Sequence, residues 1–512
     1  MSQRFGWGVL VIVVISLFIM FFNLGAIPLL DPDEPVYAET AREMIAFDDF
    51  LSPRIYGEYW YDKPPMYYWL VAGAFKVFGV NEFAARFPSA LLAVVCVLYV
   101  YAAGTRLFNE RAGLAGALVL TTSIEFFYLG KAAVTDITLT LFLTVALLAF
   151  IEKRYYLLYL ATGLATVTKG PVGFLFPGAI ILLFLAATRD FAVVRKMKLP
   201  SGVLLFAVVA LPWYGLMYSI HGNAFVETFI GFHNITRFTS PEHPEVAMWY
   251  YFVPVLMLGF LPWTAILAQS VWAALTSGYN HSRQLLFLIL WAAFIFLFFT
   301  VSETKLVSYI LPMYPPLALV TGWYLDRLWD RRNGARVISW PVLSTVLLGA
   351  FGAGLIYGVR VMPELATGAI AAAGLFALTI IGTWYFILRR DVDRAFWLQI
   401  CSMVLFSVIL MTLLLPQAAI AFHSRDIAQE FTARYDGTSP VYIIKQLRPG
   451  FAYYSGVYGS ELEPEGLPRL LAEKQRVFLV VGALEYQEFS EAQRQSLQVL
   501  ATVHEKMLLL KP

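Results

Sequence analysis

Long apolar runs recur along most of this chain, and they limit what it can fold into. A helix needs roughly 20 mostly apolar residues to cross a bilayer, and residues 1–417 contain one such run after another. Hydrophobic residues make up 59% of the 512 residues and charged residues only 14%, against roughly a quarter charged in an ordinary soluble domain. These features indicate a polytopic membrane protein, and they exclude a soluble enzyme, a disordered chain and a protein that binds nucleic acid.

The apolar runs predict thirteen transmembrane helices. They lie near residues 8–27, 83–105, 109–129, 135–151, 155–169, 171–187, 200–220, 250–272, 285–301, 305–328, 337–359, 365–388 and 395–417. No small-residue cleavage site follows the first run, so we expect it to be retained as a helix and not removed as a signal peptide. The two cysteines, Cys96 and Cys401, both lie in apolar runs, which excludes a disulfide framework.

Basic residues predict the orientation of these helices, because short cytoplasmic connections collect Lys and Arg. If the N-terminus is cytoplasmic, the connections at 189–198, 327–336 and 389–394 lie inside, and each carries at least three basic residues. The short connections outside carry isolated ones: Lys131, Lys169, Arg237, Lys305 and Arg360. The bias therefore places the N-terminus inside and the C-terminal end of the chain outside.

The last part of the chain has the composition of a soluble domain. Residues 418–512 hold 21 of the 72 Asp, Glu, Lys and Arg residues. Within them, 441–445 and 477–481 are predicted as strands and 485–500 as an amphipathic helix. We therefore predict a membrane domain at 1–417 and a small α/β domain at 418–512, exposed on the outer side.

A long first loop, residues 28–82, is predicted to lie on the same outer side. It carries ten acidic residues, and 35–46 and 64–78 are predicted as short amphipathic helices. Tyr67, Tyr68 and Trp69 in the second helix suit the aromatic belt of a membrane interface. Other ionisable residues of the outer connections lie in apolar surroundings, where such groups are costly and are usually paired or functional.

The polar residues of this face suit a lipid-linked substrate. Lysines and arginines at an interface can hold a lipid phosphate, and acids can act as bases or bind a divalent cation together with histidines. The chain has no P-loop and no GxGxxG after a strand. Transfer of a sugar from a polyprenyl phosphate fits these features.

Each residue also has an ordinary structural explanation when taken alone. Asp136 can cap a helix, and Lys169 and Lys305 can reach lipid head groups. His233 and His243 can be loop histidines. Two other classes of protein stay open: a transporter or flippase, which should show internal repeats and broken helices, and a non-catalytic scaffold.

Five motifs occur in an order and spacing that is specific as a set. They are Asp33-Glu34 with Tyr37-Ala38-Glu39, Tyr61-Asp62-Lys63-Pro64-Pro65, Thr135-Asp136, Thr168-Lys169-Gly170-Pro171, and Ser302 to Pro312 with Lys305 and Tyr309. On these motifs the chain resembles the GT-C superfamily of lipid-sugar-dependent glycosyltransferases. The resemblance is to the branch of protein O-mannosyltransferases and undecaprenyl phosphate–aminoarabinose transferases, and it covers roughly residues 1–417.

The resemblance implies roles for individual residues. It implies catalytic acids at Asp33, with Glu34 beside it, and at Asp136. It implies that the donor and its lipid phosphate are bound by Lys63, Lys169, Arg237, Lys305, Tyr309, Tyr37 and Tyr61. It also implies a divalent metal ion (zinc, magnesium or manganese) held by Asp62, His233 and His243. The chain departs from the family pattern in this metal site, because Asp62 stands where the aminoarabinose enzymes usually have Glu, and His233-Asn234 where the family often has Glu-His.

The implied activity is an inverting transfer from an undecaprenyl phosphate donor at the periplasmic face of the bacterial inner membrane. The expected sugar is 4-amino-4-deoxy-L-arabinose and the expected acceptor lipid A. The alternatives are a hexose, uronic acid or mannose, passed to the lipopolysaccharide core, to another glycolipid or to a protein.

Overall fold

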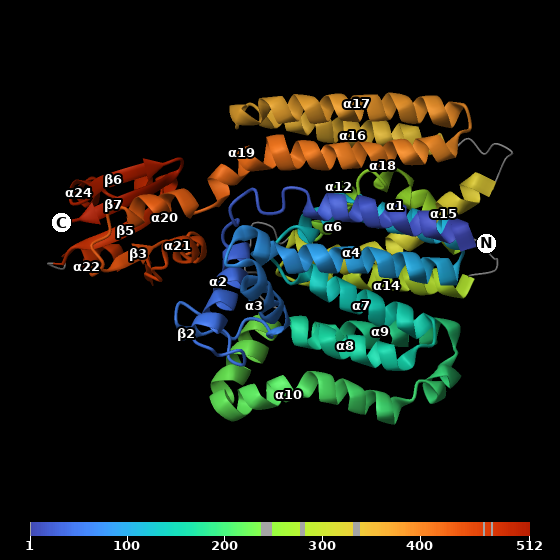
Figure 1. The fold of residues 1–512 in the computed structure, drawn as a ribbon, viewed down its shortest axis with the longest axis horizontal. Helices are drawn as coiled ribbons and strands as arrows, with labels where there is room; N and C mark the ends of the chain where they lie inside the picture. The colour runs from blue at the N-terminus through green and yellow to red at the C-terminus, as the bar shows by residue number, and fades with distance from the viewer. Residues whose placement is uncertain (1, 237–247, 277–281, 331–337, 464–465, 473–474) are drawn as a thin grey trace. The chain divides into compact units, whose positions relative to one another are not determined.

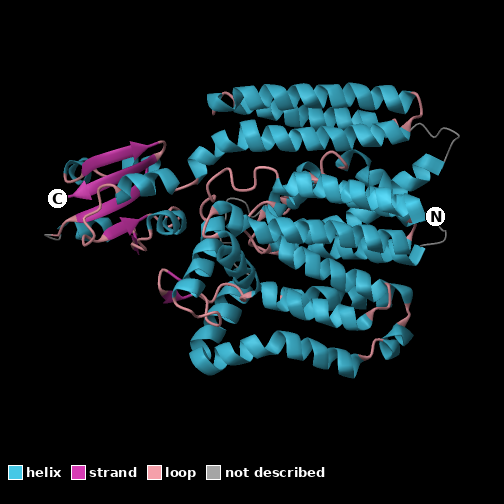
Figure 2. Cartoon of the chain, viewed as in Figure 1, coloured by secondary structure: helices cyan, strands magenta, loops and turns pink. Residues whose placement is uncertain are grey.

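The computed structural model describes residues 2–236, 248–276, 282–330, 338–463, 466–472 and 475–512, and most of them are helical (Figures 1 and 2). The chain divides into two compact units. The first unit comprises Met1–Phe22, Tyr61–Tyr67 and Ser89–Leu414, and the second comprises Asn23–Trp60, Tyr68–Pro88 and Leu415–Pro512. Most of the first loop therefore groups with the C-terminal residues, and Tyr61–Tyr67 groups with the first unit. The sequence analysis assigned the whole loop to the membrane domain; the division at 417/418 stays a prediction.

Helices make up the secondary structure of the described part of the first unit. They are α1 (Ser2–Phe21), most of α4 (Glu82–Leu107), α5 (Glu110–Thr121), α6 (Ile124–Gly130), α7 (Asp136–Ile151), α8 (Tyr155–Lys169), α9 (Val172–Thr188), η1 (Phe191–Lys196), α10 (Leu199–Val226), η2 (Glu227–Thr236), α12 (Phe252–Gly259), α13 (Thr264–Thr276), α14 (Ser282–Val301), η4 (Val307–Met313), α15 (Tyr314–Asp330), α16 (Ser339–Gly358), η5 (Pro363–Leu365), α17 (Ala366–Leu388), α18 (Val392–Ile409) and η6 (Leu410–Leu414).

These helices make the chain a multi-pass membrane protein. Within the described residues, six helices are long and apolar enough to cross a membrane, and two bent pairs raise the number to eight. The bent pairs are α5 with α6, at 66°, and α12 with α13, at 106°. They occupy the predicted spans 109–129 and 250–272, which are therefore broken and not straight. Three further apolar helices, at Trp7–Phe21, Asp136–Ile151 and Val172–Thr188, are shorter.

Glycines allow close packing between α5 and α15. A Cβ atom added at Gly322 would lie within 3.0 Å of backbone atoms of Ala112 and Gly116. Small residues let transmembrane helices approach closely enough for extensive van der Waals contact. The two helices therefore pack backbone to backbone at this point.

The segment 221–236 differs from its prediction. The sequence analysis treated it as the start of an outer loop, but α10 and the π-helical turns of η2 continue through it. Aromatic packing explains the difference, because Phe225 and Phe229 stack on each other at 5.4 Å and both contact Trp213. Gly222 has φ +58° and changes the direction of the helix there, a conformation that glycine adopts without steric cost.

The second unit combines short helices with two sheets. Its elements are α2 (Asp33–Ala46), β1 (Arg54–Ile55), β2 (Glu58–Tyr59), most of α3 (Met66–Phe78), the start of α4, α19 (Leu415–Ala419), η7 (Ile420–Phe422), α20 (Arg425–Thr432), β3 (Val441–Ile443), α21 (Arg448–Ser455), β4 (Ser460–Glu461), α22 (Leu467–Ala472), β5 (Val477–Gly482), α23 (Ala483–Glu488), α24 (Glu491–Gln495), β6 (Gln498–Val503) and β7 (Lys506–Lys511). Helices α2 and α3 occupy the region where the sequence predicted two helices.

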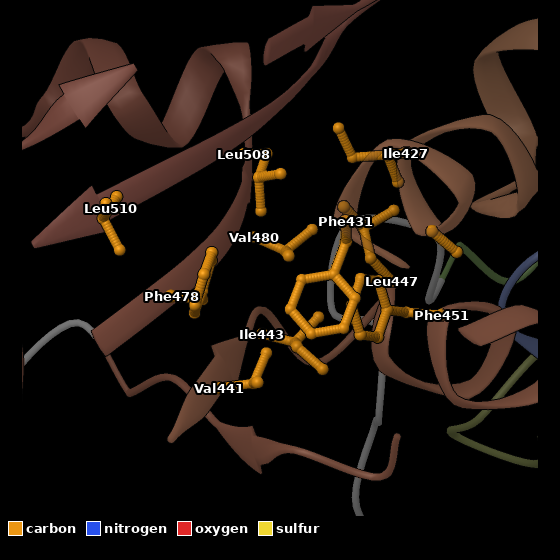
Figure 3. Close-up of a cluster of buried hydrophobic side chains, with 11 residues drawn as sticks. Ile427, Phe431, Val441, Ile443, Leu447, Phe451, Phe478, Val480, Leu508 and Leu510 are labelled. Atoms are coloured by element: carbon orange, nitrogen blue, oxygen red, sulfur yellow. The ribbon is translucent and has the colours of Figure 1, made fainter. Parts of the chain in front are cut away.

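A five-stranded mixed sheet organises residues 415–512, which we call the C-terminal module. Its strand order is β4-β3-β5-β7-β6; β3 runs parallel to β4 and β5, whereas β7 runs antiparallel to β5 and β6. Buried side chains of α20, α21 and the sheet form its core (Figure 3), with Phe431 against Phe451 at 4.9 Å and against Phe478 at 5.5 Å.

The predicted helix at 485–500 is wrong. The segment instead forms α23, α24 and β6, because Ser490 starts a new helix with a capping box to Gln493 and Gln498–Val503 pairs with β7. The strands β3 and β5 overlap the two predicted strands.

Candidate functional site

Two aspartate–lysine pairs lie in the first unit. Lys63 Nζ lies 2.8 Å from Asp62 Oδ1. Lys169 Nζ lies 2.7 Å from Asp136 Oδ1. The side chains of all four residues retain between 10% and 17% of their accessible surface, so each charge is paired but not sealed from a ligand.

The second pair joins the ends of two neighbouring helices. Asp136 is the first residue of α7 and Lys169 the last residue of α8, and α7 packs against α8 (Figure 1). Asp136 thus lies where a helix dipole favours negative charge and Lys169 where it favours positive charge. The chain folds so that two residues 33 positions apart meet with the charges that each helix end prefers.

Tyr309 and Asp62 connect the two pairs. Lys169 Nζ lies 5.2 Å from the centre of the Tyr309 ring, and the charge of Asp62 also acts on Lys169. We call Asp62, Lys63, Asp136, Lys169 and Tyr309 the lysine cluster. Two carboxylates balance its two ammonium groups, so an anionic ligand would have to compete with the aspartates for the lysines.

Aromatic side chains border this cluster at the start of the 61–65 segment. The Tyr61 ring lies 5.3 Å from the ring of His221 and 5.7 Å from that of Phe225. Tyr67, two residues beyond Pro65, shares a 2.7 Å hydrogen bond with Ser89 of α4. These contacts hold the 61–67 segment against α4 and α10.

Lys305 binds backbone carbonyl oxygens near the end of a helix. Its ammonium group donates to the carbonyl oxygens of Thr300, at 2.9 Å, and Ser302, at 2.6 Å. A lysine that bonds the last carbonyls of a helix stabilises its C-terminus; Thr300 lies in the last turn of α14, and Ser302 follows its last residue. Its role in donor binding stays a prediction. Lys131 acts in the same way on α1, donating to Ile19 and Phe22.

Glu125 is a buried acid that the sequence analysis did not single out. It lies in α6, and Tyr314 donates a short hydrogen bond to its Oε2 atom. Its charge also couples to that of Asp136. An acid inside an apolar run is a signal that the sequence offered, because ionisable groups are rare at membrane depth.

The first-loop acids lie in the second unit and differ sharply from one another. Asp33, the first residue of α2, is exposed, whereas Glu34 beside it is buried. Tyr37 is one turn further along, with its ring 5.8 Å from that of Tyr68. A carboxylate in the first turn of a helix is stabilised by the helix dipole, and Asp33 lies at that end of α2.

Glu34 is fully engaged by Arg86, a residue that the sequence analysis missed. Arg86 donates to both carboxylate oxygens, at 2.8 and 2.6 Å. Its remaining donors reach the carbonyl oxygens of Leu24, Ile27 and Pro28. All five donors of the guanidinium group are thereby used. This arrangement holds residues 24–34 to the start of α4; the catalytic role of Glu34 stays a prediction.

Of the three predicted metal ligands, the structure describes the side chain of Asp62 alone. Arg237 and His243 lie outside the described residues, and so does the side chain of His233. Among the described residues, no group of three or more His, Cys, Asp and Glu side chains could hold a metal ion. Asp62 itself accepts from Lys63. The described residues alone therefore do not form a metal site.

Comparison with known proteins finds relatives that include the region of both pairs. The family described as dolichyl-phosphate-mannose-protein mannosyltransferase matches residues 62–214, which include both aspartate–lysine pairs. An uncharacterised protein of Aquifex aeolicus is 31% identical over 65% of this chain and 67% of its own length. The undecaprenyl phosphate-alpha-4-amino-4-deoxy-L-arabinose arabinosyl transferase of Edwardsiella ictaluri is 28% identical over 81% of this chain and 78% of its own.

The fold has a solved counterpart. The crystal structure of ArnT from Cupriavidus metallidurans bound to undecaprenyl phosphate superposes with a TM-score of 0.83, covering 99% of this chain and 98% of that one at 23% identity. The chain therefore shares the fold of this membrane protein. The chain is thus similar to the aminoarabinose transferases over most of its length and to the protein mannosyltransferase family over residues 62–214.

Proposed function

We propose that this chain transfers a sugar from a polyprenyl phosphate to an acceptor at the outer face of the membrane. The best-supported donor is undecaprenyl phosphate–4-amino-4-deoxy-L-arabinose and the best-supported acceptor is lipid A, because the relatives with that name match along most of the chain. The lysine cluster carries the proposal, since it offers two ammonium groups, 2.7 and 2.8 Å from their aspartates, to the phosphate of the donor.

The charge balance of the reaction explains why two lysines are useful. The donor phosphate is a diester with one negative charge, and it leaves as a monoester with two. The acceptor oxygen forms a bond to the anomeric carbon as the bond from that carbon to the phosphate oxygen breaks, and the leaving phosphate keeps the electron pair. Lys63 and Lys169 therefore bind the leaving group more strongly than the donor, which lowers the barrier.

The acids have separate roles in the proposal. If the acceptor is a lipid A phosphate, it is already a nucleophile, and Asp33 orients it or pairs with the ammonium of the amino sugar. If the acceptor is a hydroxyl, Asp33 takes its proton as a general base. Asp136 holds Lys169 in place through their 2.7 Å contact. Tyr309, whose ring faces Lys169, belongs to the donor site.

Purified protein and defined donors test the proposal. With undecaprenyl phosphate–aminoarabinose and lipid A, we expect transfer by the wild type and none by Asp33→Asn. Asp48→Asn is the matched control, because Asp48 is an exposed acid of the same loop. Near-normal transfer by Asp33→Asn, or no transfer by the wild type from any polyprenyl phosphate sugar, would overturn the assignment.

A second candidate keeps the reaction and changes the substrates. The match of residues 62–214 to the mannosyltransferase family, and Asp62 in place of the usual Glu, favour a different sugar or a protein acceptor. Transfer of mannose, another hexose or a uronic acid in the same assay, without transfer of aminoarabinose, would select this candidate.

The proposed topology completes thirteen spans by adding α1, α7, α8, α9 and α15 to the six long helices and two bent pairs. The N-terminus then lies in the cytoplasm, and the C-terminal module lies in the periplasm beside the bacterial inner membrane. A cysteine at Glu461 should react with an impermeant reagent from the periplasm, and one at Arg390 only after permeabilisation. The reverse pattern would contradict the topology.

The divalent metal of Asp62, His233 and His243 also remains a prediction. The metal content of the purified protein tests it, together with transfer before and after treatment with a chelator. Loss of transfer on chelation, restored by one metal, would support the prediction. Full transfer by metal-free protein would contradict it.

A further inference from the structure

The first loop and the C-terminal module lie in one compact unit, and polar contacts join them. The residues involved lie near the start of α2 on one side and in η7, α20 and α21 on the other. None of these contacts belongs to the roles proposed above. They bear on a question that the proposed function leaves open, namely what the C-terminal module does.

Asp31 makes the central contact. Its Oδ1 atom accepts a hydrogen bond from the backbone N–H of Gly450, at 2.8 Å, and its Oδ2 atom accepts one from the hydroxyl of Ser424, at 2.5 Å. Its own backbone N–H donates to the carbonyl oxygen of Phe422, at 2.7 Å. A single residue of the loop is thus bound at three points to residues about 400 positions later in the chain.

Gly450 is shaped for this contact. A Cβ atom added there would lie within 3.0 Å of the Asp31 carboxyl group, a distance that real Cβ atoms do not show. Any side chain at position 450 would therefore push the carboxyl group away from the N–H that binds it. The contact needs a glycine as well as the aspartate.

Three further contacts join α2 and its neighbours to α21. Arg42 donates to the carbonyl oxygen of Tyr453, at 2.9 Å. The backbone N–H of Leu29 donates to the hydroxyl of Tyr454, at 2.7 Å. The guanidinium of Arg448 lies 3.9 Å from the centre of the Tyr56 ring, within the range of a cation–π interaction. The Asp31 contact is therefore the centre of an extended interface.

We propose that the C-terminal module positions Asp33 by holding the start of α2, with Asp31 as the positioning residue. This inference rests on the proposed function, because it assumes that Asp33 takes part in the transfer. Asp33 opens α2 two residues after Asp31, so a displacement of Asp31 moves the N-terminal turn that carries Asp33. A shift of about 1 Å in such a group can lower a rate about a hundredfold.

The pH dependence of kcat is a readout that a purely structural role of Asp31 would not change. Burial raises the pKa of Asp31 from 3.8 to about 7, against the lowering effects of Ser424, Gly450 and Lys506. The charged and titratable groups that act on the same surroundings are Lys506 of β7, Glu34 of α2 and Tyr56 of the first loop. Since burial raises the folded-state pKa, the fold favours protonated Asp31, and the stability linked to this protonation is fully present below about pH 4 and is lost as pH rises through about 7.

Substitutions at Asp31 and Gly450 test the proposal in the full-length protein. Asp31→Asn keeps the shape of the side chain and one oxygen acceptor for the Gly450 N–H, and its amide can donate to the Ser424 oxygen in place of accepting from it. We expect near wild-type kcat with a flatter pH profile between pH 6 and 8. Asp31→Ala and Gly450→Ala should each lower kcat roughly tenfold to a hundredfold. The affinity for undecaprenyl phosphate, measured by its dissociation constant, should stay within about twofold, because the lysine cluster is untouched. Gly466→Ala is the control, because a Cβ there meets nothing within 4 Å.

A double variant separates the contact from general destabilisation. In the double variant, Asp31→Ala removes the carboxyl group that the new methyl group of Gly450→Ala would meet. The two losses in kcat should therefore not add. Additive losses would overturn the proposal. So would wild-type kcat in both single variants, or an equal loss of donor affinity, which would indicate that the module acts on donor binding.

Hydrogen exchange distinguishes failure of this inference from failure of the proposed function. We expect the backbone amides of Leu29, Asp31 and Gly450 to exchange faster in Asp31→Ala than in the wild type and in Asp31→Asn. Unchanged exchange would overturn the contact itself. If exchange is faster in Asp31→Ala but the wild type transfers no sugar, the contact is supported and the proposed function fails.

Discussion

The two units use ion pairs in opposite ways. In the second unit, Arg86 and Glu34 retain 3% and 6% of their side-chain surface, and every donor of the arginine has a partner. In the first unit, Lys169 retains 17% and, among the residues that the structure describes, donates to a single acceptor, Asp136. The first arrangement leaves no donor of Arg86 for a ligand, whereas the ammonium group of Lys169 can still donate to one.

The largest expected effect comes from breaking the saturated pair. Arg86→Ala leaves Glu34 buried without its partner, which should cost about 3–5 kcal/mol and abolish the recovery of folded protein. Arg106→Ala is the control, because its ion pair with Glu152 is largely exposed on the arginine side and should contribute less than about 1 kcal/mol. Size-exclusion profiles and thermal melting would measure both. Equal stability of the two variants would remove the distinction between the units.

The next effect concerns catalysis without unfolding. Lys169→Met removes one of the two ammonium groups that we propose bind the leaving phosphate, and we expect kcat to fall about a hundredfold to a thousandfold while the protein stays folded. Asp136→Asn should add little to this loss, because Asp136 acts through Lys169. Lys196→Met, an exposed lysine, serves as the control in the transfer assay. A wild-type kcat for Lys169→Met would mean that this pair is structural after all.

Lys63 should affect the binding of the lipid phosphate as well as the rate. Lys63→Ala removes a charged hydrogen-bond donor from the phosphate, worth about 1.5–3 kcal/mol, so the dissociation constant for undecaprenyl phosphate should rise roughly tenfold to a hundredfold. Titration calorimetry or fluorescence with the purified protein gives the value. An unchanged dissociation constant would exclude Lys63 from the phosphate site.

The smallest effect is expected at Lys305, the predicted donor residue whose contacts are those of a helix cap. Lys305→Met should lower stability by about 1 kcal/mol and leave the affinity for undecaprenyl phosphate within about threefold. A larger loss of affinity would support the predicted role of Lys305 in donor binding. It would also show that a lysine bonded to helix carbonyls can still bind the donor.

The sequence predicted the membrane class, most helices and the residues of the lysine cluster. Asp136 and Lys169 could be nominated because each is an isolated charge at the end of an apolar run, and two neighbouring antiparallel helices bring such ends together. Arg86 had a readable signal as well, since an arginine inside the apolar helix at 82–107 needs a partner. The identity of that partner, 52 positions away, depended on how the first loop folds.

The contact of Asp31 could not be predicted in the same way. Its partners, Ser424 and Gly450, lie in a separate part of the chain, and no local pattern relates an aspartate in a loop to a glycine in a short helix. The error at 485–500 has a similar cause, because the pairing of β6 with β7 overrode an apolar spacing that also suits a helix. Long-range pairing, not local propensity, decided both.

Mass spectrometry of lipid A tests the central claim most directly. Cells that produce this chain together with the aminoarabinose donor should add a pentosamine to lipid A. The added mass should disappear with Asp33→Asn and persist with Asp48→Asn. Lipid A that carries the pentosamine equally with Asp33→Asn, or that is unchanged by the wild-type chain, would contradict the assignment of this protein as an aminoarabinose transferase.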